Sequence, residues 1–110
     1  SQDTRRARPQ KVGFRSTPCW MAYVLADSVF FKRHTLRDKA VYPDFGCNAE
    51  CFANHEIVEL ETLGPLTRLG PGGMVEHVET WGLWRGRVRA SGDAALARKL
   101  LALLDRVAPP

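Results

Sequence analysis

Short runs of strand-forming residues, separated by turn residues, make up most of this chain. Valine and the aromatic residues favour strands, and clusters of Gly, Pro, Asn and Asp end them. On this basis we expect strands at residues 11–14, 19–25, 28–34, 47–52, 56–63, 65–69 and 74–84. The second and third should form a hairpin about Ala26 and Asp27, and short connections should make the last three antiparallel neighbours. The chain is therefore expected to be mainly β, with antiparallel strands.

One stretch near the C-terminus has a different periodicity. Its apolar residues recur at helical spacing, at Leu96, Leu100, Leu103, Leu104 and Val107. Residues 91–93 supply Ser, Gly and Asp as N-cap candidates, and Pro109 and Pro110 cannot continue a helix. We expect one amphipathic helix at residues 94–107. Its leucine stripe should pack on the sheet, and docking of a partner helix is the less favoured alternative.

The positive charge is concentrated at the N-terminus. The net charge is +4, and the first fifteen residues hold five basic residues and one acidic residue, while the other 95 hold eleven of each. A basic end beside a neutral body is typical of a solvated tail, so we expect a basic flexible tail at residues 1–10, an antiparallel β domain at 11–90 and a C-terminal helix at 91–110. No aromatic platform accompanies the basic residues, so nucleic acid is not an expected partner. Membrane association is not expected either, because no apolar run approaches the roughly 20 residues of a membrane span.

The three cysteines indicate free thiols. An odd number, Cys19, Cys47 and Cys51, fits a reducing compartment better than a disulfide framework, so we expect a cytoplasmic protein. Cys47, Cys51 and His55 are spaced by four residues and could be considered as zinc ligands. The sequence lacks a second compact ligand pair, and cysteine is commonly a small buried residue. We therefore expect no metal and no cofactor.

Two carboxylates lie two residues apart in a strand-like run. Because side chains alternate along a strand, Glu59 and Glu61 should share one face, about 6.6 Å apart along the strand. After the next turn, the run at 74–84 carries His77, Glu79 and Trp81 on one face. Carboxylates, an imidazole and an indole on neighbouring strands are typical of a carbohydrate site.

The order of several motifs resembles the aldose 1-epimerase (galactose mutarotase) family, and especially its bacterial members of unassigned function. The downstream motifs are Leu60-Glu61-Thr62, Leu69-Gly70-Pro71-Gly72-Gly73 and His77-Val78-Glu79-Thr80-Trp81. The upstream motifs are Trp20-Met21-Ala22-Tyr23, Phe31-Lys32-Arg33 and Tyr42-Pro43-Asp44-Phe45-Gly46, followed by Glu50. Gly73 stands where the family usually has Glu. The resemblance covers residues 11–84 and corresponds to the C-terminal part of such proteins.

This resemblance implies a fold, an activity and a set of site residues. The fold would be a partial sandwich of the galactose mutarotase-like type with one C-terminal helix. Glu61 would be the catalytic base in the interconversion of aldose anomers, which proceeds by acid–base proton transfer. The residues that would bind the sugar are Glu59, His77, Trp81, Tyr42 and Asp44.

The length of the chain leaves a second function open. Members of the family are much longer than 110 residues, and their acid histidine lies in the part that has no counterpart here. We therefore expect the chain to be a fragment of a mutarotase-like protein, and its site to be incomplete. The alternative is a non-catalytic structural or interaction module, which completes a β-sheet with itself or with a companion β-chain.

Overall fold

The computed structural model describes Arg5, residues 8–89 and residues 92–106. They form two compact units. The first unit comprises the described residues up to Cys19 together with Leu36–His77, and the second comprises Trp20–Thr35 and the described residues from Val78 onward. Each unit contains one three-stranded antiparallel sheet, so the expectation of a mainly β protein with antiparallel strands is confirmed.

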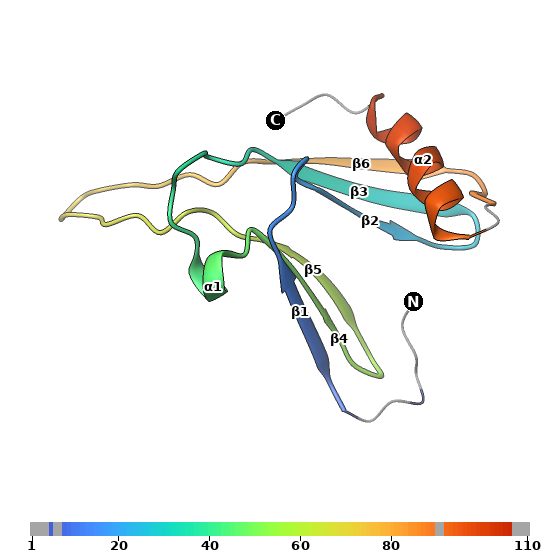
Figure 1. Ribbon diagram of the computed structural model, residues 1–110, viewed down its shortest axis with the longest axis horizontal. Coiled ribbons are helices and arrows are strands. Elements are labelled where there is room, and N and C mark those ends of the chain that lie inside the picture. Colours follow the sequence, from blue (N-terminus) through green and yellow to red (C-terminus); the bar gives the residue numbers. More distant parts are fainter. Residues whose placement is uncertain (1–4, 6–7, 90–91, 107–110) are drawn as a thin grey trace. The chain divides into compact units, whose positions relative to one another are not determined.

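The sheet of the first unit has the strand order β1-β4-β5 (Figure 1). Its strands are β1 (Gln10–Phe14), β4 (Ala49–Ala53) and β5 (Val58–Thr62), and the short helical turn α1 (Pro43–Gly46) precedes β4. An asparagine closes the β4–β5 hairpin, because the Asn54 Oδ1 accepts hydrogen bonds from the backbone N–H groups of Glu56 and Ile57, both at 2.8 Å. Such a turn sets the register of the two strands.

Side-chain alternation gives this sheet two different faces. Lys11 and Gly13 on β1 lie opposite Phe52 and Glu50 on β4, which lie opposite Glu59 and Glu61 on β5. These six residues form what we call the charged face. The residues between them point to the other side, which we call the apolar face, and they include Val12, Phe14, Cys51, Val58 and Leu60.

The sheet of the second unit has the order β2-β3-β6. Its strands are β2 (Trp20–Val24), β3 (Ser28–His34) and β6 (Glu79–Arg85). The first two form the expected hairpin, with a hydrogen bond of 2.8 Å from the Leu25 N–H to the Ser28 carbonyl. β3 then pairs with β6, so that the central strand has a partner on both sides (Figure 1).

Helix α2 (Asp93–Leu104) covers one face of this second sheet (Figure 1). The core consists of Val29 and Phe31 from β3 and of Leu100 and Leu104 from the helix, all at most 7% exposed. The expected packing of the leucine stripe on the sheet is thus confirmed. The helix ends at Leu104, earlier than expected, and Gly92 is its N-cap without a side-chain hydrogen bond. Ser91, Val107, Pro109 and Pro110 lie outside the described residues.

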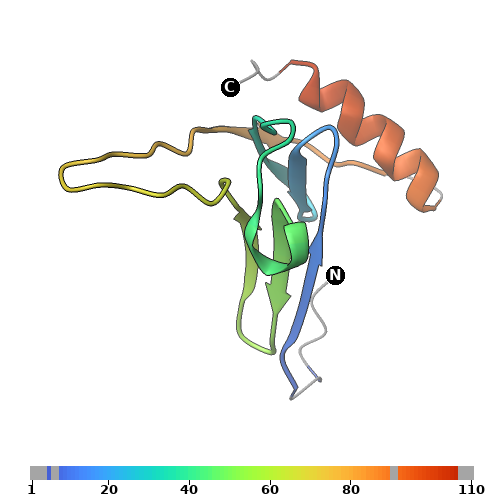
Figure 2. The same ribbon diagram turned by 60° about the vertical axis from the view of Figure 1, so that its left-hand side comes forward.

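Two strand predictions are wrong. In the part of the chain that the structure describes, residues 63–78 contain no strand, and β6 begins only at Glu79. Pro65 and Pro71 lack the N–H that a ladder needs, and the glycines beside them weaken a strand, so this segment forms a long loop (Figure 2). The turn within it is present as expected, because the Gly73 N–H donates to the Gly70 carbonyl at 2.9 Å and Gly72 has φ +74°.

The predicted pairing of the last strands is also wrong. β5 and β6 belong to different sheets, and the partner of β6 is β3. The register of β6 is therefore set by its seven residue pairs with β3, such as Lys32↔Trp81, and not by the turn at Gly72. A long loop cannot transmit register in the way that a two-residue hairpin does.

Candidate functional site

A cavity of about 450 Å³ lies on the charged face of the first unit. Its walls come from three places in the sequence: Lys11 and Gly13 on β1, Glu50 on β4, and the segment around α1. Gly13 keeps this space open, because a Cβ at this position would lie 2.7 Å from the Cys47 Sγ and 3.3 Å from the Glu50 Oε1. Any larger side chain at residue 13 would therefore displace the wall of the cavity.

Lys11 bridges two carboxylates at this cavity. Its Nζ lies 2.7 Å from the Glu50 Oε2 and 3.1 Å from the Glu61 Oε2. The hydrogen bonds to Glu50, and secondly to Glu61, raise the pKa of the Lys11 ammonium, so that it stays protonated at neutral pH. The Glu50 side chain is only 5% exposed, whereas the Glu61 side chain is 29% exposed. Glu50 lines the cavity, whereas Glu61 lies outside its lining, is the more exposed carboxylate of the pair and is joined to the cavity through Lys11.

The α1 segment adds a second carboxylate-bearing wall in an unusual backbone conformation. Asp44 and Phe45 both line the cavity, and both have positive φ values, 47° and 61°. The left-handed region is costly for residues with a side chain, particularly for a bulky one, and such strain is concentrated at binding and catalytic sites. Phe45 is fully exposed, so this conformation holds an aromatic ring in solvent beside the cavity.

Tyr42, in contrast, is part of the structural framework of the first unit. It is 4% exposed, and its hydroxyl accepts a hydrogen bond of 2.9 Å from the Arg37 N–H. The Arg15 guanidinium lies 5.3 Å from the centre of its ring, a cation–π distance. These contacts explain its burial without a ligand. Its predicted role in sugar binding stays a prediction.

The structure does not bring His77 to Glu61. The His77 Nε2 lies 2.8 Å from the Thr62 Oγ1. Thr62 directly follows Glu61 on β5 and therefore points to the opposite face of the sheet. His77 is thus hydrogen-bonded on the other side from the carboxylate that it was expected to accompany. It also lies in the long loop before β6, not on that strand.

Trp81 and Glu79 belong to the second unit. The Trp81 indole N–H donates to the Glu79 Oε2 at 2.8 Å, and the Glu79 Oε1 pairs with the Lys32 Nζ at 2.8 Å. The indole also meets the Phe30 ring edge-on, with centroids 5.6 Å apart, and remains 65% exposed. The expectation that Trp81 lies on a strand next to that of Glu61 is wrong, because the two strands belong to different sheets.

Of the predicted residues, Asp44 lines the cavity, and Glu61 is linked to it only through its ion pair with Lys11. Glu59 shares the charged face with Glu61, as expected, but its side chain is exposed. Sequence reasoning missed Lys11, Phe45 and the buried Glu50. Glu50 had a detectable signal, since a carboxylate within the apolar run Ala49, Cys51 and Phe52 is an unusual residue for a short strand.

The cysteines give no sign of a metal centre. Cys47 lines the cavity, whereas Cys51 points to the apolar face of the sheet. Among the described residues, no three His, Cys, Asp or Glu side chains are grouped closely enough to hold a metal ion. None of the described helices is long and apolar enough to cross a membrane.

No known protein family, curated protein or solved structure matches this chain. The resemblance to the mutarotases therefore consists of the sequence motifs alone.

Proposed function

We propose that this chain is a carbohydrate-binding, mutarotase-like protein, that the cavity on the charged face is its sugar site, and that Glu61 is the residue that accepts the anomeric proton. The finer fold assignment, a partial sandwich of the galactose mutarotase-like type, and the cytoplasmic location are parts of the same proposal. The observation that carries it is the Lys11 bridge between Glu50 and Glu61 at the edge of a 450 Å³ cavity.

The chemistry of the walls suits a sugar. A monosaccharide presents many hydroxyl groups, which need both acceptors and donors, and one flatter apolar side. In the walls, Glu50 and Asp44 are acceptors, the Lys11 ammonium is a donor, and the Phe45 ring can cover C–H groups. Glu61, the second partner of Lys11, is a further acceptor next to the walls. A volume of 450 Å³ lies within the range of about 300 to 1,000 Å³ that is typical of small-molecule sites.

The geometry supports binding more directly than turnover. In mutarotation a base removes the proton of the anomeric hydroxyl, an acid protonates the ring oxygen, and the ring opens and closes on the other face. Glu61 is the proposed base of the first step. Lys11 is a poor acid for the second, because its hydrogen bonds to Glu50 and Glu61 raise its pKa and it gives up its proton reluctantly. Aldose binding is therefore the core of the proposal, and anomer exchange is its enzymatic extension.

The test is a titration of the full chain with D-galactose and D-glucose, followed by backbone amide NMR. We expect millimolar sugar to shift the resonances of Lys11, Glu50 and residues 44–47. The Glu61→Gln variant should lose most of this response, because its amide is neutral and disrupts the Lys11 bridge. The matched control is Glu56→Gln, a change of the same charge at an exposed turn position. Unchanged spectra of the wild-type chain in the presence of both sugars would exclude a sugar site here.

If the chain also exchanges anomers, saturation transfer between the two anomeric protons will measure the rate. Glu61→Gln should then slow the exchange by about 100-fold or more, the usual scale for a general base, whereas Glu56→Gln should leave it unchanged. If the sugar binds but its anomers do not exchange, the chain has a sugar site without mutarotase activity.

A second candidate function, a module that completes a β-sheet, is favoured by the edge strand β1. All five residues of β1 are exposed, and on the apolar face Val12 is 61% and Phe14 38% exposed. An exposed edge with apolar side chains is a template for another strand, from a second copy or a companion β-chain. Light scattering of the wild-type chain should then give a mass above one chain, and Val12→Lys should lower it to that of the monomer. A wild-type monomer at high concentration would contradict self-association.

A further inference from the structure

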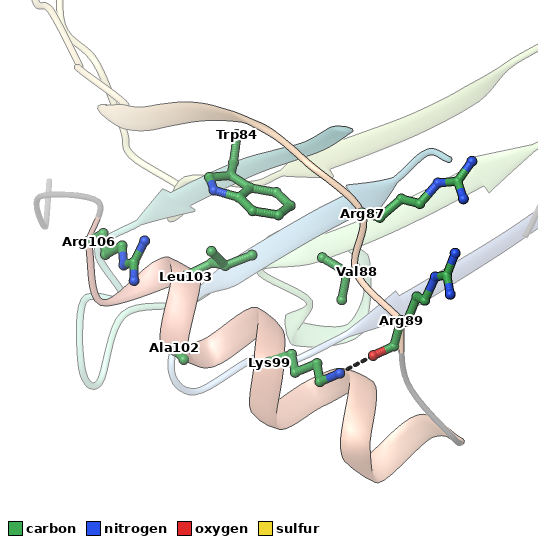
Figure 3. A pocket seen from close by; sticks show the side chains of 8 residues that line it. All are labelled: Trp84, Arg87, Val88, Arg89, Lys99, Ala102, Leu103 and Arg106. Atoms are coloured by element: carbon green, nitrogen blue, oxygen red, sulfur yellow. Dashed lines mark hydrogen bonds between the residues drawn. The ribbon is translucent and has the colours of Figure 1, made fainter. Parts of the chain in front are cut away.

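The second unit contains a smaller cavity, of about 230 Å³, that the sugar site does not involve (Figure 3). One wall is the end of β6 with the segment that follows it, and the other is helix α2 with the turn that follows it. Its apolar surface is formed by Trp84, Val88 and Leu103, whose side chains come from both walls (Figure 3). The same three residues pack against the core of the unit, so the apolar floor of the cavity is held in place by the fold.

The rest of the lining is cationic. Arg87 and Arg89 come from the segment after β6, Lys99 comes from the helix, and Arg106 comes from the turn that follows the helix (Figure 3). No acidic side chain lines the cavity, and within the described part of the chain none of these four residues forms an ion pair. The Lys99 Nζ donates to the Arg89 carbonyl, which ties the two walls together and leaves the ammonium charge uncompensated.

All four of these side chains are exposed, so an anion can reach them from the solvent. Arginine presents a planar fork of N–H donors that matches the geometry of a carboxylate or a phosphate, and two guanidinium groups with an ammonium group can neutralise either. The apolar floor of the cavity favours a second, apolar group on the same ligand. An indole binds a flat ring by offset stacking or edge contact, and Val88 and Leu103 supply further apolar surface.

We infer that this cavity binds a small aromatic acid, a single flat ring that bears a carboxylate or a phosphate group. The volume agrees with this class, because an engineered apolar cavity of about 150 Å³ already holds benzene. The remaining space in a cavity of 230 Å³ suits one acidic substituent, directed toward the arginines. The ring would contact Trp84, and the acid would pair with the guanidinium groups. Those of Arg87 and Arg89 point away from Trp84 in Figure 3 and would turn toward the bound acid.

The probes are four small molecules that separate the ring from the charge. Benzoate and phenyl phosphate carry both, benzyl alcohol carries the ring without the charge, and inorganic phosphate carries the charge without the ring. Titrations of the full chain are followed through the Trp84 indole N–H and the Ala102 and Leu103 amide resonances. We expect the first two to bind at least about tenfold more tightly than the last two, since each missing group removes a charged hydrogen bond or a stacking contact. The affinities for benzoate and phenyl phosphate, compared with each other, show whether the site prefers a carboxylate or a phosphate group.

The variant that tests the site is the double substitution Arg87→Gln and Arg106→Gln, which removes one charge from each wall. It should weaken the binding of benzoate or phenyl phosphate by about tenfold or more. Its control is Arg85→Gln with Arg98→Gln, which changes the net charge equally at two exposed positions on β6 and α2, outside the lining. The control should remain within about twofold of the wild-type affinity, since exposed charges act only weakly at a distance in salt.

Three results would overturn the inference. Benzyl alcohol binding as tightly as benzoate would make the cavity an apolar one, and inorganic phosphate binding as tightly as phenyl phosphate would make it a simple anion site. Equal losses in the two double variants would show that net charge, not the cavity, controls binding. A spectrum of the Arg87→Gln and Arg106→Gln protein that retains the shifts of β2 and β3 shows that the fold is intact.

Discussion

Phe31→Ala should lower the free energy of unfolding by about 3–5 kcal/mol, the usual cost of removing a phenylalanine from a close-packed core. Phe31 is 1% exposed and lies at the centre of the second sheet, on β3, where strands pair on both sides. Its ring packs against Val29 and against Leu100 and Leu104 of α2. Truncation therefore leaves a cavity between sheet and helix that neither element can close by local movement.

This loss is large for a chain of 110 residues, since domains of this kind are stable by only about 5–15 kcal/mol. The midpoint of thermal unfolding, Tm, should fall by roughly 10–20 °C. Two other phenylalanines are matched controls at higher exposure. Phe30→Ala removes a half-buried ring that contacts Trp81 and should cost less, and Phe45→Ala removes a fully exposed ring and should leave Tm nearly unchanged.

Urea unfolding of the three variants, followed by circular dichroism, measures the series. The expected order of destabilisation is Phe31→Ala, then Phe30→Ala, then Phe45→Ala. If Phe31→Ala lowered the free energy of unfolding no more than Phe30→Ala does, the face of the second sheet that α2 covers would not be the core.

The elements that the sequence predicts well are the ones whose signal is local. The hairpin of β2 and β3 needs only two strand-forming runs and a short turn, and helix α2 needs only a repeat of leucines. The partner of a distant strand is not encoded in that way. β6 pairs with β3, which lies 45 or more residues earlier, and any strand with a compatible face could have filled that place.

The same reason limits what could be predicted of the candidate site. The shared face of Glu59 and Glu61 follows from alternation along one strand, and the structure has it. The partner of Glu61 is Lys11, fifty residues away, and it becomes a neighbour only because β4 joins β1 to β5. The error with Trp81 has the same origin, since its strand was assigned to the nearest run in sequence instead of the central strand of the second sheet.

The largest expected effect in the first unit is that of Asn48→Ala, because Asn48 is a fully buried polar side chain. Its Oδ1 accepts the Ser16 N–H at 2.6 Å, and its Nδ2 donates to the Ser16 carbonyl at 3.1 Å and to the Cys19 Sγ at 3.1 Å. One amide thus satisfies both backbone groups of Ser16 and fixes the segment between β1 and Cys19.

Truncation to alanine leaves the Ser16 N–H without its acceptor, which costs about 1–3 kcal/mol for each buried group left unsatisfied. We expect a total loss of about 2–4 kcal/mol in urea unfolding. The control is Asn54→Ala, at the hairpin turn, where the lost hydrogen bonds are exposed and water can replace them. That variant should lower the free energy of unfolding by about 1 kcal/mol, which is the usual effect of removing a helix-capping side chain.

Asn48→Asp separates the role of the amide N–H groups from the role of volume. The introduced carboxyl group fills the same space, but its ionised form would face the Ser16 carbonyl and the Cys19 sulfur, which the amide group of Asn48 now satisfies. Burial raises the pKa of such a group above its ordinary value near 4, because the charged form is disfavoured. The carboxyl group therefore binds its proton more tightly in the folded state than in the unfolded state. As a result, the free energy of unfolding should fall as the pH rises from about 4 toward neutrality.

The thiol of Cys19 gives an independent measure of the same network. Burial raises its pKa in the wild-type chain, and the Sγ also donates to the Ser16 carbonyl at 3.0 Å, so alkylation should be slow. Both Asn48 variants should speed the reaction of Cys19 with iodoacetamide relative to Asn54→Ala, as shown by mass spectrometry of the Cys19 peptide. Asn48→Asp with a stability independent of pH, together with a Cys19 that remains slow, would mean that the Asn48 amide does not hold this part of the first unit together.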